Sequence, residues 1–264
     1  MNINGLDGAL RVLKRSPRTG LSLIKSKVLP RKAVSEFYVD GFRVRMRPPS
    51  VLPQVSEIFA GDAYLAPRVA NIKKILDLGA NVGLASLMME RGHPNAHIEC
   101  VECDPELACI LRSNISRNSA GRIRVHEFAA WIKDTQLEFE ANGLGGGRLR
   151  DRGLALVDGV DILSWMEANG PFDLIKVDIE GAERRVIKHA LSEFRKAAVI
   201  LIEYHFESGE PQDLASLLEF LQSEGYRYFF RNDGPKYSPG SDLMARPFES
   251  QVFISAYREN TIYD

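Results

Sequence analysis

The sequence predicts an α/β protein with a Rossmann-like fold, in which a mostly parallel seven-stranded sheet carries helices on both faces. From residue 72 onward, strand-like segments alternate with helix-like segments, and this alternation is typical of parallel sheets. The segments ILDL, LIKV and AVILI are continuously apolar, as expected when both faces of a sheet are covered. Ligands bind such sheets at the carboxyl ends of the strands. Functional residues are therefore expected at those ends.

Turn and capping residues set the limits of the predicted elements. Gly92 closes the first helix of the main region, with Pro94 beyond it, a common way for a helix to end. The Asp40-Gly41 pair between two alternating segments predicts a β-hairpin. The predicted strands cover 73–80, 96–103, 122–131, 172–181, 197–206, 226–230 and 251–257, and the predicted helices cover 50–64, 82–92, 105–118, 161–169, 182–191 and 214–224.

Three regions are expected along the chain. Residues 1–50 are predicted to form an N-terminal appendage with helical and hairpin character, and residues 51–264 the main domain. Within that domain, residues 135–157 contain Asn142-Gly143 and three consecutive glycines, which indicate an irregular or hairpin insertion. The length of 264 residues is enough for one large α/β domain with a full core.

Composition and charge narrow the class of protein. The formal net charge is −1, so we expect no nucleic-acid partner. No apolar run approaches the roughly 20 residues that a spanning helix needs, and the N-terminus lacks a signal-peptide pattern; these features predict a cytoplasmic protein. Cys100, Cys103 and Cys109 are odd in number and close together, which makes a disulfide framework unexpected. No second cysteine or histidine pair completes a zinc site.

The turn after the first strand of the main region carries a candidate cofactor site. Asp77 precedes the sequence Gly79-Ala80-Asn81-Val82-Gly83. The two glycines allow a tight turn and a close approach of the backbone to a ligand. A dinucleotide fingerprint would have further glycines where Asn81 and Leu84 stand. Asp77 would repel a pyrophosphate and attract the ammonium of a methionine moiety, so the turn predicts S-adenosyl-L-methionine rather than a nicotinamide dinucleotide.

Two further residues extend this candidate site. Glu102 ends the second strand about 20 residues beyond the glycines, where a carboxylate can accept hydrogen bonds from both ribose hydroxyls. Ala129, near the end of the third strand, is a candidate for the wall of the adenine pocket. Taken alone, either acidic residue could be a solvated or capping group; together, their spacing favours the cofactor.

The blocks ILDLGANVGLAS, VECDPE, NISRN, FDLIKVDIEGAERRVI and ILIEYHF occur in this order and resemble the FkbM family of S-adenosylmethionine-dependent methyltransferases. The resemblance covers residues 50–206, and LIKVDIEGAE is its most specific part. It implies a class I methyltransferase fold. It also implies O-methylation of a hydroxyl on a sugar, a glycan or a polyketide-type small molecule.

A set of polar residues is expected where the fourth and fifth strands end. Alternation places Lys176, Asp178 and Glu180 on one side of their strand, and Glu203 and His205 on one side of the next. Methyl transfer to a hydroxyl needs a group that accepts the proton. His205 is the predicted base, because its unperturbed pKa lies near neutrality. Asp178 and Glu203 are its predicted catalytic partners, and Lys176 and Glu180 are candidates for substrate binding.

Other interpretations of this set stay open. Lys176 could form a buried ion pair that only stabilises the sheet. Glu183 could serve only as a first-turn residue of its helix, where a carboxylate favours the helix dipole. Asp178, Glu203 and His205 could together bind a divalent cation, since carboxylates and imidazole suit one. We prefer a mechanism without a metal.

Basic residues near the N-terminus suggest two contacts with anionic groups. Arg43, Arg45 and Arg47 alternate with apolar residues, and Arg45 is a candidate for binding an anionic substrate such as a nucleotide-linked or lipid-linked sugar. The stretch 11–32 has eight basic residues and no acidic one. It is a candidate for peripheral contact with anionic lipid, although Pro17 interrupts the amphipathic pattern expected of an interfacial helix.

Other functional classes fit the sequence less well. A nicotinamide-dependent oxidoreductase is disfavoured by the missing glycine fingerprint and by Asp77. A methyltransferase acting on RNA or protein is disfavoured by the near-zero net charge and by the lack of an aromatic substrate-amine motif. A binding module without catalysis is disfavoured because both the cofactor residues and His205 are present. The leading hypothesis is an O-methyltransferase with a small-molecule or glycan acceptor.

Overall fold

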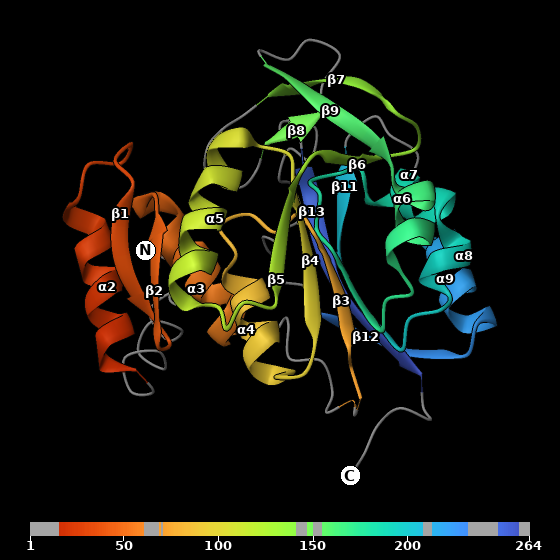
Figure 1. Ribbon diagram of the computed structural model, residues 1–264, viewed down its shortest axis with the longest axis horizontal. Helices are drawn as coiled ribbons and strands as arrows, with labels where there is room; N and C mark the ends of the chain where they lie inside the picture. The colour runs from red at the N-terminus through yellow and green to blue at the C-terminus, as the bar shows by residue number, and fades with distance from the viewer. Residues whose placement is uncertain are drawn as a thin grey trace, which may run out of the picture.

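The computed structural model places most of the chain in a single α/β architecture (Figure 1). The structure describes residues 16–60, 69, 71–140, 147–149, 155–207, 213–231 and 248–258.

The centre of the fold is a seven-stranded sheet, as the sequence predicts. Its spatial order is β12-β13-β11-β10-β3-β4-β5. The strands from β11 to β5 pair in parallel, whereas β13 runs antiparallel to both of its neighbours. The strands are β3 (Lys74–Leu78), β4 (His97–Glu102), β5 (Ile123–Glu127), β10 (Leu174–Val177), β11 (Val199–Glu207), β12 (Tyr226–Arg231) and β13 (Phe248–Arg258).

Helices cover both faces of this sheet, so its central strands are buried on both sides (Figure 1). One face packs against α3, α4 and α5, and the other packs against the remaining helices of the main domain. The two apolar layers explain why the central strands have little polar alternation. The helices are α3 (Pro48–Ala60), α4 (Leu84–Gly92), α5 (Pro105–Asn118), α6 (Ile162–Asn169), α7 (Glu183–His189), α8 (Leu191–Phe194) and α9 (Leu214–Ser223).

The N-terminal elements lie beside α3 and α5 at the left of Figure 1. They are α2 (Pro17–Val28), β1 (Ser35–Val39) and β2 (Phe42–Met46). The predicted hairpin is confirmed: β1 and β2 pair antiparallel, and Asp40 and Gly41 have φ values of 45° and 96°, the left-handed conformations that a tight hairpin turn uses. The division of the chain at residue 50 stays a prediction.

A second, four-stranded sheet lies over the carboxyl ends of the main strands (Figure 1). It accounts for the described part of the predicted insertion, and its strand β7 pairs antiparallel with both β8 and β9. The prediction of one strand over 122–131 is wrong, because the chain leaves the main sheet at buried Phe128 and continues as β6 in the second sheet. The strands are β6 (Ala129–Trp131), β7 (Thr135–Glu140), β8 (Arg148–Leu149) and β9 (Ala155–Asp161).

The predicted strand over 172–181 is also shorter than expected. Strand β10 ends at Val177, so Asp178 and Glu180 lie in the turn that follows. Glu180 there has a left-handed φ of 55°. The placement of these carboxylates is therefore set by a turn and not by strand alternation.

The cysteines form no disulfide: Cys100, Cys103 and Cys109 are all free. Within the described part of the chain, no helix combines the length and apolar character required to cross a membrane.

Candidate active site

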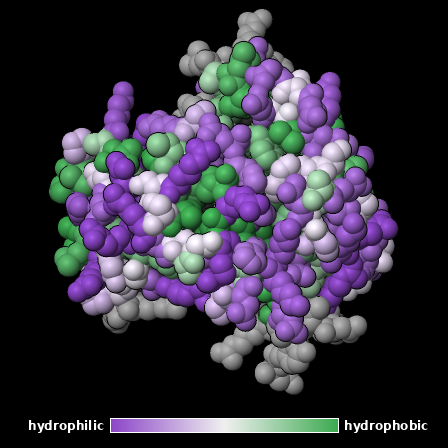
Figure 2. Space-filling view, in the orientation of Figure 1, coloured by the Kyte–Doolittle hydropathy of each residue, from purple (hydrophilic) through white to green (hydrophobic). Residues whose placement is uncertain are grey.

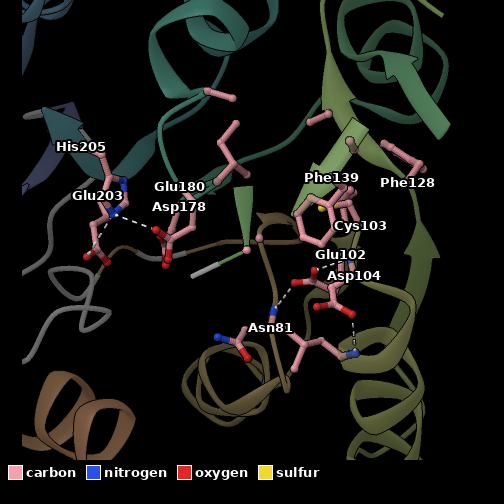
Figure 3. Close-up of a pocket in the computed structure, with 18 of the residues that line it drawn as sticks. Asn81, Glu102, Cys103, Asp104, Phe128, Phe139, Asp178, Glu180, Glu203 and His205 are labelled. Atoms are coloured by element: carbon pink, nitrogen blue, oxygen red, sulfur yellow. Dashed lines mark hydrogen bonds and ion pairs between the residues drawn. The ribbon is translucent and has the colours of Figure 1, made fainter. Parts of the chain in front are cut away.

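A pocket opens where strands β3, β4, β10 and β11 end (Figure 3). The walls come from the turns after these strands, from α3 and from the second sheet. Most of the predicted site residues line this pocket: Gly79, Asn81, Glu102, Ala129, Asp178, Glu180, Glu203 and His205. Residues distant in the sequence thus meet at the carboxyl edge of the sheet, as the fold class predicts.

The glycine turn, residues 79–83 after β3, lies between the two ends of the pocket. One end is at Glu102 and the other is at His205. Gly79 has a φ of 79° and Asn81 a φ of 53°, so the backbone turns sharply after β3. A Cβ atom on Gly79 would lie 1.7 Å from the carbonyl oxygen of Asp178. Only glycine can therefore occupy this position. The same contact fixes the turn after β10 directly against the turn after β3.

Glu102 is held at one end of the pocket by backbone groups. Its Oε2 accepts a hydrogen bond from the Asn81 amide and its Oε1 accepts one from the Asp104 amide, both at 2.8 Å. Burial raises the pKa of Glu102 to about 7, although these two donors oppose the shift. Each oxygen keeps a further lone pair for a ligand hydroxyl. This carboxylate fits the predicted contact with ribose.

An apolar wall stands beside Glu102 (Figure 3). Phe128 and Ala129 come from the crossing between the two sheets, and Phe139 comes from β7. Aromatic and small apolar side chains suit a flat heteroaromatic ring such as adenine. Phe139 was not predicted, although the alternation in TQLEFE gives the signal, since its apolar residues face one side of β7.

Asp77 takes a different position from the predicted one. Its carboxylate is fully buried and is absent from the pocket lining. It accepts a hydrogen bond from Ser86 Oγ at 2.5 Å and pairs with Lys176 Nζ at 3.2 Å. Direct contact with a cofactor ammonium does not fit this burial, so the prediction for Asp77 needs correction. Asp77 instead stabilises the base of the glycine turn.

Lys176 is likewise buried and does not line the pocket. It donates to the Gly79 carbonyl oxygen at 3.0 Å and pairs with Asp77 and, at 3.5 Å, with Asp178. The ion-pair interpretation therefore describes it better than substrate binding. Its ammonium links the turns after β3 and β10, because it contacts groups from both.

Gly83 and Arg45 also lie outside the pocket lining. Gly83 precedes α4 with a φ of 86°, and a Cβ atom there would lie 2.4 Å from the Leu111 side chain of α5. Its role is close helix packing instead of cofactor contact. Arg45 belongs to β2, where its amide donates to Asn114 Oδ1. The structure therefore does not bring Arg45 into the predicted substrate site.

A polar cluster occupies the other end of the pocket (Figure 3). Strand β11 carries Glu203 and His205 on one side, and the turn after β10 brings Asp178 and Glu180 toward them. His205 Nε2 lies 3.7 Å from Glu180 Oε2 and 3.8 Å from Glu203 Oε1. The predicted meeting of these four residues is confirmed by their shared place in the pocket lining.

The residue that orients His205 is Glu183, not Asp178 or Glu203. Glu183 Oε1 lies 3.0 Å from His205 Nδ1. The Glu183 carboxylate also accepts hydrogen bonds from the amides of Ile179 and Gly181. Glu183 is the first residue of α7, as expected, but it is buried. Its role thus includes fixing the imidazole and turning Nε2 toward the pocket.

The charges around His205 change its predicted role. Burial alone would lower the pKa of His205, but the carboxylates of Glu183, Glu180 and Asp178 outweigh burial and raise this pKa to about 10. Burial would raise the pKa of Glu183, but His205 and the backbone donors lower it. His205 is therefore an imidazolium at neutral pH in this arrangement. An imidazolium has no lone pair for a proton, so His205 does not fit the predicted role of base, which requires a pKa near neutrality.

The cluster also has the composition of a cation site. Asp178, Glu203 and His205 can each offer one ligand atom, and these atoms lie within 4.8 Å of one another. Two carboxylates and an imidazole suit a divalent transition metal. The preference for a mechanism without a metal stays a prediction.

Comparisons with known proteins identify the family of this chain. Residues 77–228 match the model of the methyltransferase FkbM domain. The methyltransferase sdnD of Sordaria araneosa is 28% identical over 202 residues, which cover 62% of this chain and 78% of that protein. The 2-O-methyltransferase NoeI of Sinorhizobium fredii is 28% identical over 176 residues, which cover 56% of this chain and 71% of that protein.

A solved structure shows the same fold. The S-adenosylmethionine-dependent methyltransferase from Agrobacterium tumefaciens superposes with a TM-score of 0.51 and 12% identity, over 88% of this chain and 72% of that chain.

The FkbM model spans more than half of the 264 residues, and the chain belongs to the FkbM methyltransferase family. It is an S-adenosylmethionine-dependent methyltransferase. This assignment replaces the alternative of a nicotinamide-dependent oxidoreductase.

Proposed function

We propose that the chain transfers the methyl group of S-adenosylmethionine to a hydroxyl oxygen of a glycan or another small polyhydroxylated acceptor. The observation that carries this proposal is the polar cluster of Asp178, Glu203 and His205 at the opposite end of the pocket from Glu102. The name of the relative NoeI, a 2-O-methyltransferase, supports an oxygen acceptor.

The residues at the Glu102 end fit the cofactor. Glu102 would hold the ribose hydroxyls, and the wall of Phe128, Ala129 and Phe139 would hold the adenine. The backbone of Gly79 and Asn81 would then run along the methionine part. When bound, S-adenosylmethionine supplies an electrophilic methyl group on its sulfonium sulfur. In this orientation, the methionine part would extend toward the polar cluster.

Asp178 is the proposed proton acceptor. Its backbone contacts Gly79 in the cofactor turn, and its carboxylate belongs to the polar cluster. It therefore connects the cofactor end with the acceptor end. A hydroxyl oxygen becomes strongly acidic as its new bond to carbon forms, so a carboxylate is a sufficient base. His205 and Glu203 would then position the hydroxyl, with the imidazolium acting as a donor.

The acceptor end of the pocket offers groups that suit several hydroxyls. Glu180 and Glu203 supply carboxylate oxygens, and Gln251, which lies opposite His205 on β13, supplies an amide that both donates and accepts. Such a mixture can bind vicinal hydroxyls of a sugar ring. The predicted role of Glu180 in substrate binding remains part of this proposal.

The proposal is tested with isotopically labelled S-adenosylmethionine and a panel of acceptors. The panel contains oligosaccharides, nucleotide-linked sugars, hydroxylated small molecules, transfer RNA and a protein mixture. Label is expected in an oxygen-bound methyl group of a carbohydrate or small molecule, located by mass spectrometry. Label in RNA or protein alone, or on nitrogen or carbon, would contradict the proposed acceptor.

The pH profile separates the two candidate bases. With Asp178 as the base, turnover should stay level from about pH 7 to pH 9. With His205 as the base, turnover should rise across this range, because its pKa is about 10 and the neutral form increases with pH. A rising profile that is lost in His205→Gln would return the histidine to the role of base.

A further inference from the structure

Helix α2 presents an apolar stripe to the outside of the molecule. Leu21, Ile24 and Val28 have exposed fractions of 65%, 58% and 79%. Their spacing of three and four residues places them on one side of a helix. Figure 2 shows hydrophobic side chains at the left edge of the molecule, where α2 lies in Figure 1. The usual arrangement of a surface helix, with its apolar side facing the core, is reversed over most of α2.

The opposite side of α2 is fixed to the protein by small polar side chains. Thr19 and Ser22 are buried. Thr19 Oγ1 accepts a hydrogen bond from the Asp40 amide at 2.9 Å, and Ser22 Oγ accepts one from the Tyr38 amide at 2.8 Å. Turning the helix to bury its apolar stripe would break these bonds and leave buried amides unpaired, which is costly. The outward orientation of the stripe is therefore part of the fold.

Basic residues surround the stripe. At 100° per residue, Arg18 and Lys25 lie on one side of it and Lys27 lies on the other. Arg31 and Lys32 follow directly after the helix, and all five residues are exposed. The sequence from 17 to 34 contains no acidic residue. A partner that covers this surface must therefore be apolar at its centre and negatively charged around it.

Pro17 does not interrupt this surface. The predicted interruption at Pro17 is wrong, because Pro17 is the first residue of α2, a position that proline favours. The segment from Pro17 to Val28 is thus one continuous helix with one apolar stripe.

We propose that α2 binds the surface of an anionic lipid bilayer. Leu21, Ile24 and Val28 would enter the boundary between headgroups and acyl chains, and Lys27, Arg31 and Lys32 would contact lipid phosphates. A second copy of the chain is a poorer partner, because a symmetric contact would bring two basic surfaces together. Helix α2 packs against α3, which lines the active-site pocket, so the bound membrane would lie on the α3 side of the enzyme.

Vesicle co-sedimentation tests this proposal. The full chain is mixed with vesicles of phosphatidylcholine alone or of phosphatidylcholine with phosphatidylglycerol. The chain is expected to bind the anionic vesicles preferentially. The triple variant Leu21→Ser, Ile24→Ser, Val28→Ser should lose at least roughly tenfold in partitioning, because three apolar side chains no longer leave water. The variant Lys27→Gln, Arg31→Gln, Lys32→Gln should lose the preference for anionic lipid.

A matched control removes exposed apolar side chains elsewhere. Leu156, Phe229 and Phe230 have exposed fractions of 67%, 61% and 50%, and their triple serine variant should keep the partitioning of the natural chain. Binding of S-adenosylhomocysteine by each variant shows that it is folded. Absence of binding to anionic vesicles, or equal losses in the α2 variant and the control, would overturn the proposal. So would a dimer, detected by light scattering, that the α2 variant dissociates.

Discussion

The two ends of the pocket hold their polar groups in different ways. At the cofactor end, Glu102 is held by the backbone amides of Asn81 and Asp104, whose positions are fixed by the turns after two neighbouring strands. At the acceptor end, backbone amides hold Glu183, but His205 is held by its contact with Glu183 and faces Glu180 and Glu203. The first arrangement depends on backbone geometry alone, whereas the second also depends on a balance of charges.

This difference has consequences for substitutions. Changing a side chain at the cofactor end should alter ligand affinity and leave its neighbours in place. Changing one charge at the acceptor end should alter the protonation and position of the remaining groups, because buried charges interact strongly.

The substitution Asp178→Asn should have the largest effect. It removes the proposed proton acceptor and keeps the shape of the side chain, so turnover should fall by about 10²–10⁴-fold. Affinity for S-adenosylhomocysteine should stay nearly unchanged. Steady-state turnover and calorimetric titration measure the two quantities. Asp158→Asn, at an exposed position of β9, is the matched control and should keep full turnover. Near-normal turnover of Asp178→Asn would remove the residue from the mechanism.

The substitution Glu183→Gln should lower the stability of the fold. It removes the counter-charge of a buried imidazolium, and loss of one partner in such a pair costs about 3–5 kcal/mol. Urea unfolding at pH 7 measures this loss. Glu193→Gln is the control, since Glu193 is also buried but its partner Lys196 is half exposed, and the cost there should be about 1 kcal/mol or less. Equal losses of unfolding free energy in the two variants would show that the Glu183–His205 pair contributes no more to stability than the partly exposed Glu193–Lys196 pair.

The substitution Glu102→Gln should weaken cofactor binding. The lost charge-assisted hydrogen bonds correspond to about 1–3 kcal/mol, or roughly 5- to 150-fold in Kd. Calorimetric titration with S-adenosylhomocysteine measures this change. Glu127→Gln is the matched control, because Glu127 lies next to Glu102 in register on β5 and faces outward to Arg112. If both variants bound the ligand as the natural chain does, Glu102 would not be the ribose ligand.

The same residue predicts a pH dependence. The pKa of Glu102 is raised to about 7, so the side chain is protonated below this pH and accepts hydrogen bonds less well. Affinity for S-adenosylhomocysteine should therefore increase as pH rises from 6 to about 8. In Glu102→Gln the affinity should be weaker and independent of pH over this range. A pH dependence that persists in the variant would assign the titration to another group.

Removal of divalent metal should have the smallest effect. Without a metal in the mechanism, turnover should survive extensive treatment with EDTA. Loss of turnover that magnesium or manganese restores would instead make Asp178, Glu203 and His205 ligands of a catalytic ion. The distances in the cluster are compatible with such a site, so this experiment decides between two defined mechanisms.

The sequence predicts the sheet well, because strands depend on local patterns, and it predicts three residues that line the cofactor end of the pocket, Gly79, Asn81 and Glu102. Apolar strands, glycine positions and Glu102 are read directly from short segments. The predictions that the structure corrects fail because of contacts between segments that are distant in the sequence. Asp77 and Lys176 become a buried pair because β3 and β10 are adjacent in the sheet. Phe139 reaches the pocket because the second sheet folds over it.

The acceptor end is predicted in its residues but not in its chemistry. The sequence indicates that Asp178, Glu203 and His205 meet. The protonation of His205 could not be predicted, because it depends on Glu183, which reaches the imidazole only through the packing of α7 against β11. A residue's ordinary pKa is therefore a poor guide wherever several carboxylates surround it.

A crystal structure with S-adenosylhomocysteine bound is the decisive measurement. The ribose hydroxyls should contact Glu102, the adenine should lie between Phe139 and Ala129, and the sulfur atom should point toward Asp178. A ligand bound in the opposite direction, with its ribose at the polar cluster, or bound outside this pocket, would contradict the proposed cofactor site.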